Sequence, residues 1–289
     1  MVMLPDGKIW YVDSHNHRIV KIDPSNNYAI LRTVGRLGNG EGEFDAGVYS
    51  MTRDNNGFLY IMSTFGNIKK LDSNGGYIAS YNLSTLDSPN DLSDPRGIVY
   101  DIYTDTFLIS NKNRHRVERF TKDFVFIDGF GSFGTGDSQF NEPQSLSVDV
   151  NGRIYVADEF NARVQVFSSD FTHQFNIVNW TEGSNTINFE AVKDIVILSD
   201  GTITITSQNN QRVVQFDESG NFIRVWGFSG VEDSNLISPQ YLAKDQNDNI
   251  FVSDGGKRAI LKYSSTGVYK YLRYLDTYQY NWYRWYGQW

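Results

Sequence analysis

Six stretches of this chain alternate apolar and polar residues with the two-residue period of a pleated β-strand. The run RVQVF at 163–167 shows the alternation most clearly, and a polar loop separates it from an earlier strand of the same kind. No stretch has the period of a helix, so the pattern predicts an all-β protein. The six stretches read GKIWYVDSHNHRIVKI from Gly7, GFLYIMSTFGNIKKL from Gly57, TFLISNKNRHRVERF from Thr106, GRIYVADEFNARVQVF from Gly152, GTITITSQNNQRVVQF from Gly201 and NIFVSDGGKRAILKY from Asn249.

The stretches recur at a nearly constant interval, which marks them as repeats of one structural unit. The repeat is about 48 residues long, so the 289 residues hold six repeats and leave no room for a second domain. The interval is measured between the residues that end the first strand of each stretch, Asp13, Ser63, Asn111, Asp158, Ser207 and Asp254.

Each repeat contains four strand signals. An apolar run precedes each quoted stretch, and turn dipeptides that favour positive φ, such as Asn56-Gly57 and Asn151-Gly152, join the two as a hairpin. Residues 1–4 supply a short version of this run, and a further turn leads to an outer strand such as 222–227. Six such sheets arranged radially cover one another's faces. We therefore predict a six-bladed β-propeller over residues 1–275, with four antiparallel strands in each blade.

The fourth repeat, GRIYVADEFNARVQVF, resembles the NHL repeat, as do the Gly-rich linkers GRLGNGEGEF at 35–44 and GFGSFGTGDSQFNEP at 129–143. The resemblance covers nearly the whole chain and is weakest in the second repeat, where TFGN at 64–67 replaces the usual loop. It implies a central channel and a binding face formed by the loops between second and third strands together with the linkers between blades. Relatives of this kind include RNA-binding domains, protein-interaction domains, receptor ectodomains and an amidating lyase, so the fold does not fix the function.

We call this surface the loop face and expect recognition to occur there. The residues that recur in its loops, for example Asp158, Asn161 and Arg163, are interpreted as ties between loop and strand rather than as catalytic groups. The candidate binding residues are the loop-face histidines, bases and aromatic side chains together with one acid near the channel, namely His15, His17, Arg36, Phe65, Arg96, Lys112, Arg114, His115, Arg116, Phe160 and Asp194.

The sequence offers little for catalysis. It has no cysteine, which excludes a thiolate nucleophile and a cysteine-based metal site. His15, His17 and His115 belong to blades one and three and would have to share an ion across the blade between them, so we predict no metal and no cofactor. Asp194 lies near the loop-side entrance of the channel. The leading prediction is a non-enzymatic binding or scaffolding propeller, and a metal-assisted hydrolase or lyase at the channel is the alternative.

The charge disfavours nucleic acid as the partner. The chain carries a net charge of −8, and the loop-face linkers contain many more acids than bases. The basic residues around Arg114 and Arg116 keep an RNA-binding module as a further alternative. No apolar run is long enough to span a membrane. We expect a protein partner or a larger assembly, with a small ligand at the channel mouth as another possibility, and the compartment stays open.

Residues 276–289 follow the last repeat and are rich in aromatic side chains. Two interpretations remain open: a docking segment for another subunit or domain, or a segment that lies across the first blade and completes the ring. The aromatic residues concerned are Tyr278, Tyr280, Trp282, Tyr283, Trp285, Tyr286 and Trp289.

Overall fold

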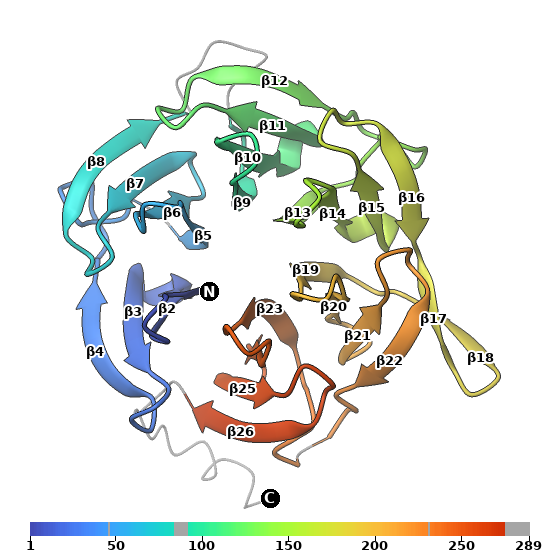
Figure 1. Cartoon of the computed structure of the whole chain (residues 1–289). Coiled ribbons are helices and arrows are strands. Elements are labelled where there is room, and N and C mark those ends of the chain that lie inside the picture. Colours follow the sequence, from blue (N-terminus) through green and yellow to red (C-terminus); the bar gives the residue numbers. More distant parts are fainter. Residues whose placement is uncertain (46, 84–91, 231, 275–289) are drawn as a thin grey trace, which may run out of the picture.

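The computed structural model describes residues 1–45, 47–83, 92–230 and 232–274 and confirms the predicted architecture. Six four-stranded antiparallel sheets surround a central channel in this part of the chain, and each sheet is one blade (Figure 1). Each blade is contiguous in sequence, and its strands run in chain order from the channel to the rim.

The first three blades comprise β1 (Val2–Met3), β2 (Ile9–Asp13), β3 (Arg18–Asp23) and β4 (Ala29–Val34), then β5 (Val48–Arg53), β6 (Leu59–Ser63), β7 (Asn67–Leu71) and β8 (Tyr77–Asn82), then β9 (Pro95–Asp101), β10 (Thr106–Asn111), β11 (Arg116–Phe120) and β12 (Phe126–Phe130). The last three comprise β13 (Pro143–Val148), β14 (Ile154–Asp158), β15 (Arg163–Phe167) and β16 (His173–Ile177), then β19 (Val192–Ile197), β20 (Ile203–Ser207), β21 (Arg212–Phe216) and β22 (Phe222–Trp226), then β23 (Pro239–Lys244), β24 (Ile250–Asp254), β25 (Ala259–Tyr263) and β26 (Tyr269–Tyr274). Single 3₁₀ turns, η1 (Ser14–Asn16), η2 (Lys112–Arg114) and η3 (Glu159–Asn161), lie in the loops of blades one, three and four.

The core consists of apolar layers between neighbouring blades, because the alternating strands send apolar side chains to both faces of each sheet. Between blades two and three, for example, the rings of Tyr60 and Phe107 lie 4.5 Å apart, and Phe107 stacks on Phe124 at 4.8 Å. An equivalent layer lies between each further pair of adjacent blades. The repeat is therefore the unit of core formation, as expected for a propeller.

The ring closes between blades six and one through residues far apart in the sequence. Ile9 and Tyr11 pack against Phe251 and Ile260 in one apolar cluster. On the rim the rings of Tyr28 and Tyr271 stack at 4.7 Å. Closure thus uses contacts between residues 1–45 and 232–274. The predicted tail at 276–289 lies outside the described residues, and its boundary and its role stay predictions.

One element was not predicted. A hairpin of β17 (Asn179–Glu182) and β18 (Asn185–Asn188) follows blade four and projects outward from the ring (Figure 1). The buried Trp180 anchors it against Phe189, with ring centroids 5.2 Å apart. Its remaining side chains are mostly polar and exposed, so the short arms give no alternation from which a strand could be predicted.

Candidate binding face

Successive strands of a blade run in opposite directions, which places the loops between second and third strands on the same side of the ring as the linkers between blades. Hydrogen bonds hold these loops in place. In blade four Asp158 accepts hydrogen bonds from Arg163 Nε at 2.8 Å, from Asn161 Nδ2 at 2.9 Å and from the Asn141 amide of the preceding linker at 2.7 Å. In blade four the recurring polar residues therefore tie the loop to its strand and to the preceding linker.

A cavity of about 310 Å³ opens at the centre of the loop face, where the channel begins. We call it the mouth. The second residue of each inner strand from β5 to β23 lines it, and these residues are Tyr49, Arg96, Gln144, Lys193 and Gln240. Phe160, which is 60% exposed, reaches the mouth from the η3 turn. The mouth therefore combines aromatic rings, amides and charges from five blades.

The cations of the mouth are paired with carboxylates. Arg96 donates to Asp94 at 2.7 Å, and its guanidinium lies 4.0 Å from the centre of the Tyr49 ring. Lys112 lies 2.9 Å from Glu142 and 3.4 Å from Asp94. Lys193 forms an ion pair with Glu159 in the same way. Because each cation has an anionic neighbour, the mouth is close to neutral.

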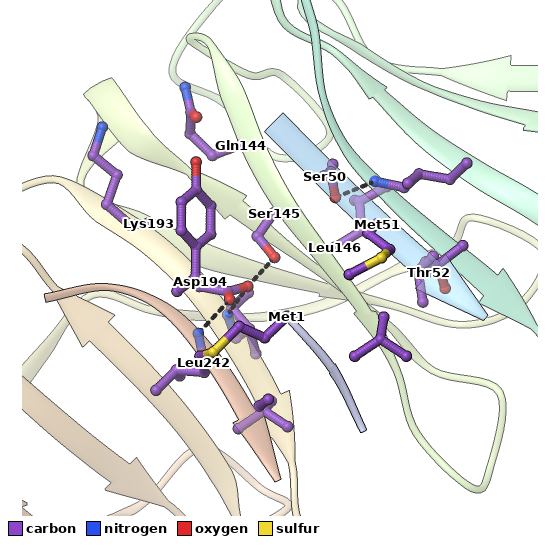
Figure 2. Close-up of a pocket in the computed structure, with 18 of the residues that line it drawn as sticks. Met1, Ser50, Met51, Thr52, Gln144, Ser145, Leu146, Lys193, Asp194 and Leu242 are labelled. Carbon is purple, nitrogen blue, oxygen red and sulfur yellow. Dashed lines mark hydrogen bonds between the residues drawn. The ribbon is translucent and has the colours of Figure 1, made fainter. Parts of the chain in front are cut away.

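Asp194 lies in the channel and joins three inner strands (Figure 2). Its carboxylate accepts hydrogen bonds from the Ser145 hydroxyl, from the backbone amide of Ile195 at 2.9 Å and from the backbone amide of Leu242 at 2.7 Å. Burial raises the pKa of this carboxyl group, and the hydrogen bonds oppose that effect. Gln144 and Lys193 point away from it, toward the mouth (Figure 2). Asp194 thus connects blades four, five and six.

Among the predicted residues, Arg96, Lys112 and Phe160 meet at the mouth, with Asp194 in the channel. The others lie farther out. Arg36 pairs with Glu43 inside its own linker, and Phe65 is 59% exposed in the turn between β6 and β7.

Two of the predicted histidines, His17 and His115, follow the 3₁₀ turns of their loops. His17 and His115 adopt left-handed φ angles of 50° and 55° directly after the η1 and η2 turns. His115 Nδ1 accepts from the Glu142 amide at 3.1 Å, and its ring lies 4.9 Å from that of Phe133. His15 lies within η1, and nothing is described of its side chain. Among residues 1–45, 47–83, 92–230 and 232–274, no three His, Asp or Glu side chains gather as a metal site would require.

The predicted basic patch is partly neutralised. Lys112 turns to its carboxylate partners at the mouth, and Arg116 Nε lies 4.0 Å from Glu118. Arg114 occupies the last position of η2 and is half-buried. The patch therefore presents less free positive charge than its sequence suggests.

Sequence reasoning missed most of the mouth, because Tyr49, Gln144 and Gln240 share no chemistry with Arg96 and Lys193. Only their register, one residue after the start of each inner strand, connects them. Tyr241, the next residue of β23, also faces the mouth, and burial raises the pKa of its phenol to about 12. Aligning the inner strands rather than the loops would have found this ring.

Comparisons with known proteins agree with this architecture. The model of the NHL repeat matches residues 140–167, which cover the first three strands of blade four. NHL repeat-containing protein 3 of Homo sapiens is 27% identical over 213 residues, which are 72% of this chain and 58% of that protein. The chain thus spans little more than half the length of the curated relatives it matches.

Solved structures show the same fold at low sequence identity. A streptogramin B lyase superposes with a TM-score of 0.66 at 16% identity, over 95% of this chain and 82% of that one. A chain of a nidogen/laminin complex superposes with a TM-score of 0.68 at 12% identity, over 92% and 93%. Similarity at this level of identity supports the propeller fold and carries no function with it. No helix in the described part of the chain has the length and apolar character needed to cross a membrane.

Proposed function

We propose that this chain, as an NHL-repeat six-bladed β-propeller, is a non-enzymatic binding module. It holds a protein partner on its loop face. The fold is in general suited to binding and scaffolding. The observation that carries the proposal is the set of large apolar side chains exposed on this face. Four phenylalanines are each more than half exposed there: Phe65 at 59%, Phe133 at 67%, Phe160 at 60% and Phe228 at 54%.

Exposed phenylalanines lower the solubility of a protein, and loops that present them are typical of a protein interface. Two of the four rings contact neighbouring side chains in the free chain. Phe133 packs against His115, and Phe228 lies under the guanidinium of Arg212 at 4.6 Å. Since little side-chain freedom is then lost on association, such anchors favour binding.

The mouth supports a second candidate, a small polar ligand. Within the described residues the side-chain amides of Gln144 and Gln240 and the hydroxyl of Tyr241 make no hydrogen bond, although all three line the cavity. An uncharged ligand with several hydroxyl or amide groups would satisfy them without disturbing the paired charges. The larger apolar surface around the mouth favours the protein partner as the main ligand.

A capture experiment with matched variants tests the protein-binding proposal. The loop-face variant replaces Phe65, Phe133, Phe160 and Phe228 with Ser, and the rim variant replaces four exposed isoleucines of the outer strands, Ile30, Ile78, Ile127 and Ile223, with Thr. Both remove the same number of exposed apolar side chains. We expect the rim variant to retain the partners of the intact chain and the loop-face variant to lose them, with both melting cooperatively. Loss in the rim variant alone would contradict the proposal.

A further inference from the structure

The linkers that follow blades one, three and five have the same local structure. Each forms an isolated parallel β-bridge between two residues seven positions apart. In each, a backbone amide also donates a hydrogen bond to the carbonyl of the residue eight positions earlier. The bridges are Leu37–Phe44, Phe133–Phe140 and Ser229–Leu236, and the hydrogen bonds run from Phe44 to Arg36 at 2.9 Å, from Phe140 to Ser132 at 2.8 Å and from Leu236 to Phe228 at 3.2 Å. These three linkers are equivalent structures repeated at every second blade.

A glycine at the same position makes this structure possible. At Gly38, Gly134 and Gly230 an added Cβ would lie only 2.2 to 2.3 Å from the side chain five residues later, which is Glu43, Gln139 or Asn235. In the first two linkers that side chain folds back and accepts the amide of Gly40 at 2.9 Å or of Gly136 at 3.0 Å. The linker backbone is therefore fixed by its own contacts.

Each linker presents an apolar tip together with a carboxylate. The tips are Leu37, Phe133 and Phe228, which are 62%, 67% and 54% exposed. The carboxylates are Glu41, Asp137 and Asp233, which occupy equivalent positions three residues after the glycine and are all exposed. Because the three linkers follow every second blade of six, the three pairs lie about a third of a turn apart around the mouth (Figure 1).

These carboxylates form no ion pair with a Lys or Arg side chain within the described residues. Asp137 accepts a hydrogen bond from Asn176 Nδ2 at 2.9 Å and lies 3.6 Å from His173 Nε2. Three neighbouring bases pair with other acids, Arg36 with Glu43, Lys112 with Glu142 and Arg212 with Glu182. Two further lysines donate to linker carbonyls, Lys69 to Gly40 at 2.9 Å and Lys257 to Asp233 at 3.2 Å. The surface around the mouth thus combines apolar tips with exposed carboxylates.

We propose that these three linkers form one three-point docking surface for a basic protein partner, which presents Lys or Arg beside apolar side chains. This inference rests on the proposed function and specifies its partner. Charge complementarity selects that class, because the carboxylates attract cations while the tips bury apolar area. The same carboxylates repel phosphate and anionic lipid. They also oppose a second copy of this chain, whose net charge is −8.

The test compares two triple charge reversals in the same blades. The loop-face reversal is Glu41→Lys, Asp137→Lys and Asp233→Lys. The control is Asp6→Lys, Asp123→Lys and Glu218→Lys, exposed carboxylates in the turns of blades one, three and five on the opposite side of the ring. Both variants change the net charge equally. A third variant, Leu37→Ser, Phe133→Ser and Phe228→Ser, removes the apolar tips.

The probe is a fluorescein-labelled peptide of three Lys-Phe-Arg-Leu blocks joined by Gly-Ser, and its binding is followed by anisotropy. We expect the loop-face reversal and the tip variant each to weaken binding at least about tenfold, and the control to change it less than about twofold. Equal weakening by the two reversals would overturn the inference, because bulk charge would then explain the binding. So would tighter binding of an RNA oligonucleotide or of anionic vesicles than of the peptide.

The capture experiment separates failure of this inference from failure of the proposed function. If the loop-face reversal still captures every partner of the intact chain while the loop-face phenylalanine variant loses them, the loop face binds protein but the basic partner is wrong. If neither variant loses a partner, both proposals are wrong.

Discussion

At the scale of single residues, the same ion pair occurs in blades one and four with very different exposure. Asp158 and Arg163 of blade four have side chains 0% and 9% exposed, whereas the equivalent Asp13 and Arg18 of blade one are 22% and 42% exposed. Removing a carboxylate from a buried pair leaves an uncompensated charge, whereas an exposed partner is solvated. Identical chemistry is therefore expected to contribute differently to stability.

We predict that Asp158→Ala lowers the free energy of unfolding by about 3 kcal/mol, because the Arg163 guanidinium loses its carboxylate in a buried site. Asp13→Ala serves as the matched control and is expected to cost about 1 kcal/mol. Chemical denaturation of the two variants measures both values. Equal losses would show that burial of the pair is not what determines its contribution.

Asp194 gives a prediction about pH. Burial raises the pKa of its carboxyl group in the folded chain, so the folded state binds this proton more tightly than the unfolded state does. The contribution of Asp194 to stability is then fully present below its ordinary pKa and is lost as pH rises through the raised value. The stability of the wild type relative to Asp194→Asn should fall as pH rises from about 4 toward neutral in denaturation experiments. An increase over this range would mean that the amide hydrogen bonds to the carboxylate outweigh its burial.

At the scale of elements, the junction between blades six and one is held on the rim by Tyr271 of β26. Its ring stacks on Tyr28, and its hydroxyl donates to Asn27 Oδ1 at 2.8 Å. We predict that Tyr271→Ala costs about 2 kcal/mol of stability, from the lost stacking, apolar burial and hydrogen bond. Tyr274→Ala, at the exposed end of the same strand, should cost less than about 0.5 kcal/mol. Thermal unfolding of both variants checks this, and equal melting temperatures would contradict the assigned closure.

The elements that were predictable are those in which local signals repeat. The two-residue alternation seen in RVQVF recurs along the chain, and Asn-Gly or Asp-Gly turns occur in four of the six blades, so the weak signals of separate repeats reinforce one another. The β17–β18 hairpin occurs once and its arms are polar, so no repetition supports it. The mouth could not be predicted from residue type, because Tyr49, Arg96 and Gln144 occupy one structural position with unrelated chemistry. Their convergence follows only from the radial arrangement of the inner strands.

At the scale of the whole molecule, the ring converts sequence repetition into a surface. Six similar blades give a common frame, while the linkers in the described part of the chain differ in structure. The Gly-rich form follows blades one, three and five, and the β17–β18 hairpin follows blade four. The proposed function therefore rests on the parts in which the repeats differ, namely the tips, the carboxylates and the residues that line the mouth.

Carboxyl footprinting of the captured complex tests the central claim, recognition at the loop face, most directly. In this measurement exposed Asp and Glu side chains are labelled covalently with and without partner, and labelling is quantified by mass spectrometry. The account predicts that labelling of Glu41, Asp137 and Asp233 falls severalfold in the complex, while Asp6, Asp123 and Glu218 are labelled as in the free chain. Protection of the second set with the first unchanged would place the partner on the opposite face of the ring and contradict the account.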